Sequence, residues 1–161
     1  MILDKEQTQK NSMMKQLVIL IFTICTLQLV AQTDYYLKKN IVIGGYDVTS
    51  YFERTPKQGV IEYALTYEGA QFYFVTQENK KKFEANPQKY IPQYGGYCAY
   101  AIGAKGEKVK IDPETYEIRD GKLYLFYNAW GTNTLDLWNE EGAVQLQAKA
   151  DRNWENIKIK E

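Results

Sequence analysis

The most apolar stretch of the chain lies near its N-terminus and runs from Leu17 to Ala31. It follows Lys15 and ends at a small residue, and this order of charge, apolar run and small residue is typical of a signal peptide. The run is shorter than the roughly 20 residues that a membrane-spanning helix needs. We therefore expect residues 1–31 to be an N-terminal extension and signal peptide, cleaved after Ala31, so that the protein is exported and periplasmic or secreted. An uncleaved N-terminal anchor is the alternative.

Strand patterns dominate the first half of the remaining chain. The runs Ile61–Tyr67 and Gln71–Val75 are rich in aromatic and β-branched residues. They flank Glu68-Gly69, whose turn chemistry predicts a β-hairpin. A shorter apolar run, Ile41–Ile43, ends at two glycines and predicts a buried strand.

The second half contains another hairpin signal. Tyr116–Arg119 and Lys122–Tyr127 flank Asp120-Gly121. This dipeptide suits a type I′ turn, which requires positive φ at both central residues. Tyr97–Ile102 also alternates, with Cys98 on one face, and predicts a further strand.

Two segments have helical patterns. Thr76 is a typical N-cap for a helix over Gln77–Asn86, and Pro87 ends that helix. From Thr134 onward the apolar spacing predicts a C-terminal helix, weakened in its middle by Gly142. Its apolar anchors are expected to be Leu135, Trp138, Val144, Leu146 and Trp154.

These elements predict a single α+β domain over residues 32–161. We expect a small mixed or antiparallel β-sheet built from hairpins, with one central helix and a C-terminal helix. The composition agrees, with 45% hydrophobic and 25% charged residues. The 20 basic and 20 acidic residues balance, and no basic stripe with interleaved aromatics is present. Nucleic acid is therefore not an expected partner.

The chemistry of the chain is limited by what it lacks. The sequence has no histidine, and Cys98 is the one cysteine that remains after removal of the leader with Cys25. Ser-His-Asp and Cys-His catalysis are excluded as usually built. An intrachain disulfide of the mature domain is excluded as well. A zinc site of cysteine and histidine ligands cannot be assembled within one chain.

Two turn segments are candidate ligand-binding sites. Tyr46-Asp47 follows two glycines, and Tyr94-Gly95-Gly96-Tyr97 joins aromatic rings to glycines, which let a ligand approach the backbone. Each has a structural alternative. Asp47 would cap its own turn through backbone N–H groups, and the tyrosines would pack in the core. Cys98 is either a small buried hydrophobe or a soft metal ligand.

Other side chains carry weaker signals. Asp112, Glu114, Asp120 and Asp151 could act as an acid–base pair, but no spacing singles out two of them. The three tryptophans are expected to be core or helix-docking anchors rather than a sugar-binding platform. They are Trp130, Trp138 and Trp154.

Four segments, in order along the chain, resemble the secreted branch of the YHS-domain family. They are Gly45–Phe52, similar to a "GYDPVAYF" block; Asn86–Ala99, similar to the central block; Asp120–Leu125, similar to "DGKLYL"; and Ala150–Trp154, similar to "AD-x-NW". The resemblance implies a metal association, because YHS modules accompany heavy-metal and copper transport proteins.

Three functional hypotheses follow. The leading one is an exported, non-enzymatic binding module that recognises a small ligand or a protein partner at Tyr46, Asp47 and Tyr94–Tyr97, with no cofactor expected. The alternative is an extracytoplasmic metal-binding protein that holds copper or zinc with Cys98 and Asp47. The third is an enzyme that uses carboxylate chemistry.

Overall fold

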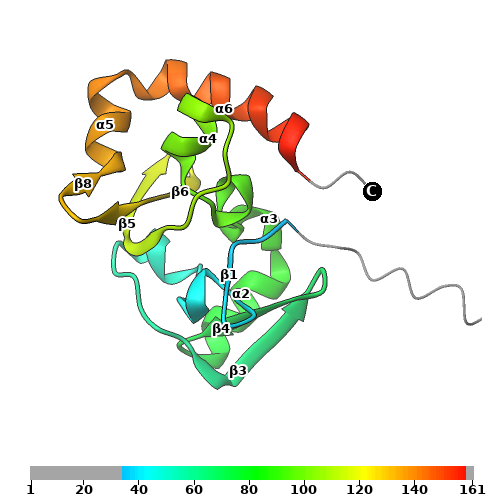
Figure 1. Cartoon of the computed structure of the whole chain (residues 1–161). Helices are drawn as coiled ribbons and strands as arrows, with labels where there is room; N and C mark the ends of the chain where they lie inside the picture. The colour runs from blue at the N-terminus through cyan, green and yellow to red at the C-terminus, as the bar shows by residue number, and fades with distance from the viewer. Residues whose placement is uncertain (1–33, 159–161) are drawn as a thin grey trace, which may run out of the picture. The chain divides into compact units, whose positions relative to one another are not determined.

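The computed structural model describes residues 34–158, and the predicted signal peptide lies outside them (Figure 1). Small sheets and helices form separate groups along this part of the chain, which confirms the predicted α+β class. Within these residues, no helix combines the length and the apolarity that a membrane crossing requires.

The larger sheet is mixed and has the strand order β1-β2-β4-β3. β1 (Leu37–Lys38) is antiparallel to β2 (Ile41–Val42), and β2 runs parallel to β4 (Ala70–Phe74). β3 (Val60–Tyr67) is the antiparallel partner of β4, so the first predicted hairpin is confirmed. The strand predicted at Ile41–Ile43 is one residue shorter, because Ile43 already belongs to the 3-10 turn η1 (Ile43–Gly45).

The second predicted hairpin is also confirmed. β5 (Asp112–Arg119) pairs with β6 (Lys122–Phe126), and Arg119 lies opposite Lys122. Asp120 and Gly121 have φ values of 50° and 72°, the positive values that a type I′ turn demands. A third, short hairpin follows, from β7 (Asn128–Ala129) to β8 (Thr132–Asn133).

The central helix begins and ends as its sequence predicts. In α2 (Gln77–Ala85), the Thr76 side chain accepts a hydrogen bond from the backbone N–H of Asn79 at 3.1 Å. Pro87 ends α2 and opens the short helix α3 (Pro87–Tyr90), since proline suits a first helical position. Phe83 is fully buried and joins α2 to the sheet.

The strand predicted at Tyr97–Ile102 is wrong, because this segment forms the helix α4 (Ala99–Lys105) after the 3-10 turn η3 (Gln93–Gly96). Its small residues let α4 lie close to the C-terminal helix. A Cβ atom on Gly103 would come within 2.6 Å of the Leu146 carbonyl oxygen. The alternating pattern was a by-product of helical spacing, in which Cys98, Ala101 and Ile102 face inward.

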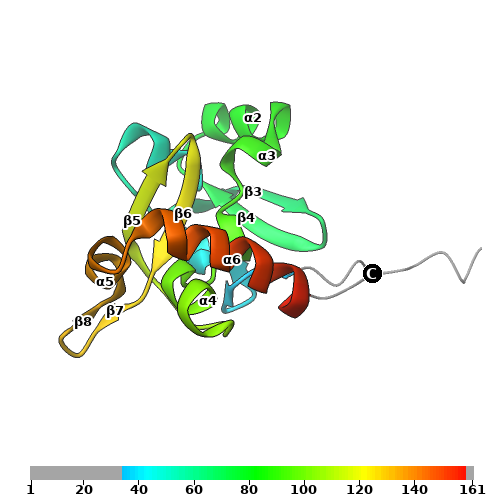
Figure 2. The ribbon, with the colours of Figure 1, turned by 90° about the horizontal axis from the view of Figure 1, so that it is seen from above.

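The C-terminal helical region is divided at Gly142, which has a φ of 97°. α5 (Thr134–Glu140) precedes it and α6 (Ala143–Ile157) follows, so the single predicted helix is two helices. Trp138 and Leu146 are buried as expected, but Val144 is 67% exposed and is not an anchor. In Figures 1 and 2, α6 lies along α4.

Two hydrophobic clusters form the interior. One gathers side chains of the mixed sheet, α2 and the first part of the chain, and includes Phe72, Phe83 and Cys98. The other lies between β6 and the helices α4, α5 and α6, and includes Tyr94, Trp138 and Leu146. The segment from Tyr94 to Ile102 supplies residues to both clusters and therefore joins the two halves of the core.

Candidate functional site

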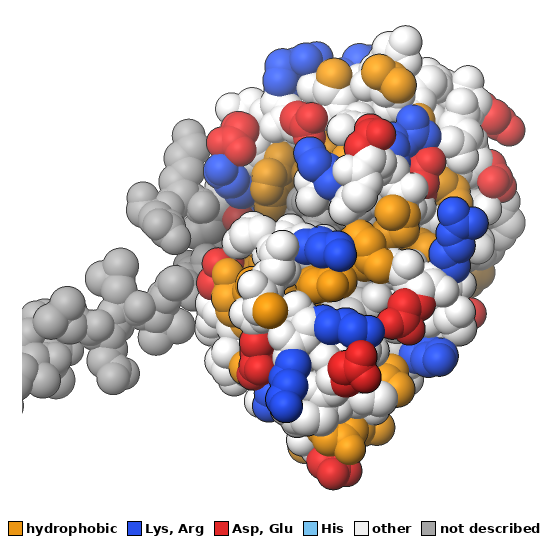
Figure 3. Space-filling model, turned by 180° about the vertical axis from the view of Figure 1, so that it is seen from behind, with side chains coloured by type: hydrophobic (Ala, Val, Ile, Leu, Met, Phe, Trp, Pro, Cys, Tyr) orange, Lys and Arg blue, Asp and Glu red, His pale blue; other side chains and the backbone are white. Residues whose placement is uncertain are grey.

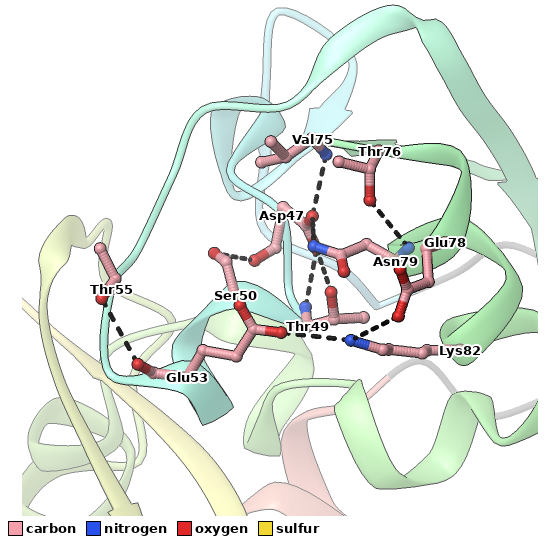
Figure 4. A network of polar contacts seen from close by, with 10 residues as sticks. All are labelled: Asp47, Thr49, Ser50, Glu53, Thr55, Val75, Thr76, Glu78, Asn79 and Lys82. Atoms are coloured by element: carbon pink, nitrogen blue, oxygen red, sulfur yellow. Dashed lines mark hydrogen bonds and ion pairs between the residues drawn. The ribbon is translucent and has the colours of Figure 1, made fainter.

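Asp47 is fully buried and lies at the centre of a polar network (Figure 4). Its Oδ1 accepts hydrogen bonds from the backbone N–H and the hydroxyl of Thr49, at 2.8 and 2.7 Å. Its Oδ2 accepts from the backbone N–H of Val75 at 2.9 Å and from Asn79 Nδ2 at 2.7 Å. A carboxylate offers about four acceptor sites, so these donors occupy all of them. Capping, one of the two interpretations of Asp47, accounts for the contacts with Thr49, while those with Val75 and Asn79 join the turn to β4 and α2.

Tyr46, the neighbour of Asp47, points to a different element. Its hydroxyl donates to Glu114 Oε1 on β5 at 3.0 Å. Burial, and then this hydrogen bond, raise the pKa of Tyr46. Tyr46 and Asp47 therefore bind separate partners and do not converge on one ligand position.

Gly95 and Gly96 allow other parts of the chain to pack closely against their backbone. Tyr94, Gly95 and Gly96 all have positive φ, and the Gly95 carbonyl accepts a hydrogen bond from the Tyr36 N–H at 2.8 Å. A Cβ atom on Gly95 would lie 1.7 Å from the Asp34 carbonyl oxygen, which no side chain could tolerate. On Gly96 it would lie 2.9 Å from Ile43 Cγ2. The close approach that these glycines permit is an internal one.

The two tyrosines of this segment are also used internally. Tyr94 is buried and donates its hydroxyl to Asp151 Oδ1 at 2.8 Å. Burial, followed by that hydrogen bond, holds the pKa of Tyr94 well above its usual range. The ring of Tyr97 is 5.6 Å from the Lys108 ammonium, which also lies 5.3 Å from the Trp154 ring and is paired with Asp34.

Cys98 follows this segment and is fully buried. Its Sγ is 3.3 Å from Thr134 Oγ1, at the start of α5. The Thr134 hydroxyl donates its single proton to the Tyr127 carbonyl at 2.9 Å, so the Cys98 thiol is the donor in their contact.

A pocket of about 320 Å³ lies against Cys98. Its walls come from α4 and the loop after it, the β7–β8 hairpin with the residue before it, and α5. Most of its lining is apolar. The lining residues are Cys98, Tyr100, Ala101, Lys105, Val109, Tyr127, Thr132, Thr134 and Leu137.

Of the predicted site residues, only Cys98 lines this pocket; Tyr46, Asp47 and the Tyr94–Tyr97 segment do not. Its other lining residues were not predicted to be site residues. One signal was available: Cys98, Ala101 and Lys105 are spaced i, i+3 and i+7, which places them on one face of a helix. The strand interpretation of this segment concealed that spacing.

The same hairpin corrects the expectation for one tryptophan. Trp130 is 93% exposed at the β7–β8 turn and is neither a core nor a helix-docking anchor. The Lys110 ammonium lies 5.6 Å from its ring. Trp138 is buried and Trp154 packs at 6.1 Å from the Tyr94 ring, as expected for anchors.

The arrangement does not fit a copper or zinc site made by Cys98 and Asp47. The Asp47 oxygens are occupied by four donors, and Asp47 is not part of the pocket beside Cys98. Among residues 34–158, no three side chains of histidine, cysteine, aspartate or glutamate are grouped so that they could hold a metal ion. A tight soft-metal site needs several such ligands.

Residues 58–94 match the family model of the YHS domain, which confirms the resemblance to YHS domain-containing proteins; the match does not test the secreted branch. The match spans β3, β4, α2 and α3 and ends at Tyr94. It includes neither Asp47 nor any residue that lines the pocket. Comparisons with curated proteins and with solved structures find no match. What the pocket binds must therefore be argued from its own residues.

Proposed function

We propose that this YHS domain-containing protein is an exported, non-enzymatic binding module that holds a small, mostly apolar ligand in the pocket beside Cys98. The observation that carries the proposal is the pocket itself. Its volume of about 320 Å³ is at the lower end of the range of small-molecule sites, roughly 300–1,000 Å³. Its apolar walls, with a few hydroxyls and one charge, have the usual character of such sites.

The lining favours binding over the two other hypotheses. It holds no carboxylate, whereas the enzymatic alternative needs a pair of them. Its one thiol contacts Thr134 Oγ1 at 3.3 Å and is joined by no histidine or carboxylate in the lining, whereas the metal alternative needs several such ligands. On the face drawn in Figure 3, acidic and basic side chains are interspersed around hydrophobic ones, which supports a small-molecule ligand over nucleic acid.

Binding in the pocket can be tested by titrating the full chain with 1-octanol, an apolar probe, and monitoring the amide chemical shifts by NMR. We expect saturable shifts at Ala101, Val109 and Thr132. Thr132 is an exposed residue at the edge of the pocket, so Thr132→Phe should fill the entrance without disturbing the core and should weaken binding at least tenfold. Thr66→Phe makes the same change at an exposed position of β3 and is the matched control. Equal binding by both variants would contradict the proposal.

Export is tested separately. The order of Lys15, the Leu17–Val30 apolar run and Ala31 motivates it. We expect N-terminal sequencing of the exported protein to begin at or next to Gln32. A full-length chain retained in the cytoplasm would contradict this part of the proposal and would leave the pocket unaffected.

A further inference from the structure

One face of α4 gives the pocket a direction. Cys98, Ala101 and Lys105 follow one another along this face, and seven residues of helix advance about 10 Å. The thiol end is fully buried, and the lysine end is exposed. A ligand that lies along α4 would therefore have one end in an apolar environment and the other beside an ammonium group.

The charge at the open end has no partner among residues 34–158. Lys105 is the one charged residue among those that line the pocket. Within residues 34–158, the ammonium group of Lys105 makes no hydrogen bond or ion pair. By contrast, the pocket hydroxyl of Tyr100 donates to Glu141 Oε1 at 2.7 Å, and that of Thr134 donates to the Tyr127 carbonyl at 2.9 Å.

We propose that the ligand is a small organic anion, with an apolar body against Ala101 and Leu137 and a carboxylate or similar acidic head group at Lys105. This inference rests on the proposed function of the pocket. A neutral apolar ligand of the same length would remove water from the ammonium group without replacing the lost hydration by a charged or hydrogen-bonded contact. A cationic ligand would be repelled by it. An anion alone pairs with Lys105, whose aliphatic stem can continue the apolar wall.

The test compares three probes with the same eight-carbon chain: octanoate, 1-octanol and octylammonium. We expect the full chain to bind octanoate about fivefold more tightly than either of the others, the size of effect that a partly exposed ion pair gives. Raising the salt concentration should reduce this preference, because exposed charges are screened.

Variants assign the preference to one residue. Lys105→Gln should weaken octanoate binding about fivefold without weakening 1-octanol binding, and Lys105→Arg should keep the preference for octanoate. Lys149→Gln, at an exposed position of α6 outside the pocket, should change neither. If octanoate and 1-octanol bind the pocket equally well, or Lys105→Gln has no effect, the anion inference is overturned while the proposed function stands. If Thr132→Phe leaves all three probes unaffected, the proposed function falls, and the inference falls with it.

Discussion

The segments that carry the family resemblance differ from the pocket beside Cys98 in whether their polar groups have partners. Around Asp47, four donors meet four acceptor sites, and at Gly95 the chain leaves no space for a methyl group. In the pocket, the Lys105 ammonium has no partner within the described part of the chain, and about 320 Å³ is not filled by side chains. Polar groups whose hydrogen bonds are all made within the protein stabilise its fold, whereas an unpaired polar group beside a pocket can bind a ligand.

This difference changes how the resemblance is interpreted. The conspicuous Gly-Tyr-Asp and Tyr-Gly-Gly-Tyr segments are internal connections between parts of the chain far apart in sequence. Asp47 ties its turn to the end of β4 and to α2, and Gly95 holds the segment from Asp34 to Tyr36. Gly96 also lies close to the Ile43 side chain, two residues before Gly45. We therefore expect substitutions in them to change stability, and substitutions in the pocket to change binding.

The largest effect is expected for Asp47→Ala. The substitution leaves the backbone N–H of Val75 and the Asn79 amide without their acceptor. An unsatisfied buried donor costs about 1–3 kcal/mol, so we expect about 3–5 kcal/mol in all. Urea denaturation at neutral pH measures it. Asp136→Ala, at an exposed position in the first turn of α5, is the control and should cost no more than about 1 kcal/mol. Equal costs would show that the network around Asp47 does not hold the fold.

A pair of glycine variants separates crowding from backbone strain. Gly95 and Gly121 both have positive φ, 61° and 72°, so alanine is strained at either position. Only at Gly95 does the new Cβ collide with backbone, and at Gly121 nothing lies within 4 Å. Gly95→Ala should therefore destabilise the domain by about 2 kcal/mol more than Gly121→Ala in the same denaturation experiment. A smaller difference would mean that residues 34–36 detach at little cost.

Local signals in the sequence were sufficient for part of this fold. Asp120-Gly121 and Thr76 predict a turn and a cap because each needs only its immediate neighbours. The segment from Tyr97 to Ile102 carries a pattern that suits either a strand or a helix. Its conformation depends on α6. The Leu146 carbonyl of that helix, more than 40 positions later, lies so close to Gly103 that a side chain there would collide with it. The helical spacing of Cys98, Ala101 and Lys105 was one local signal for the helix, but it does not by itself exclude a strand.

The candidate site shows the same limit. Capping by Asp47 predicts the contact with Thr49, two residues away, but the contacts with Val75 and Asn79 depend on the folded sheet. The pocket is harder still to predict, since its walls come from separate elements between Cys98 and Leu137. An unfilled volume is a result of tertiary packing and leaves no motif in the sequence.

A smaller effect is expected at alkaline pH. Tyr124 is almost fully buried, and its burial, followed by the negative charge of Asp151, raises its pKa to about 12. In the unfolded chain a tyrosine ionises near pH 10, so the folded state keeps a proton that the unfolded state loses. The contribution of protonated Tyr124 to the free energy of unfolding is therefore fully present below about pH 10 and is lost as the pH rises towards 12. Tyr124→Phe keeps the ring and should lose about 1 kcal/mol less than the parent protein between pH 8 and pH 11, as measured by urea denaturation. An identical loss in both would assign the alkaline effect to other groups.

The smallest effect, close to none, is expected for metal binding when Cys98 is removed. The YHS domain suggests a metal role, but the Cys98 thiol is hydrogen-bonded to Thr134, and the Asp47 oxygens are already occupied. One thiol is a poor site for Cu(I) and an incomplete one for Zn²⁺. We expect the protein to bind either ion no more tightly than about micromolar, roughly −8 kcal/mol, in competition with a chelator of known affinity. Cys98→Ala should leave that weak binding unchanged. Nanomolar binding that disappears in Cys98→Ala would reverse the comparison, because the pocket would then be one part of a metal site completed by ligands outside residues 34–158 or by a second copy of the chain.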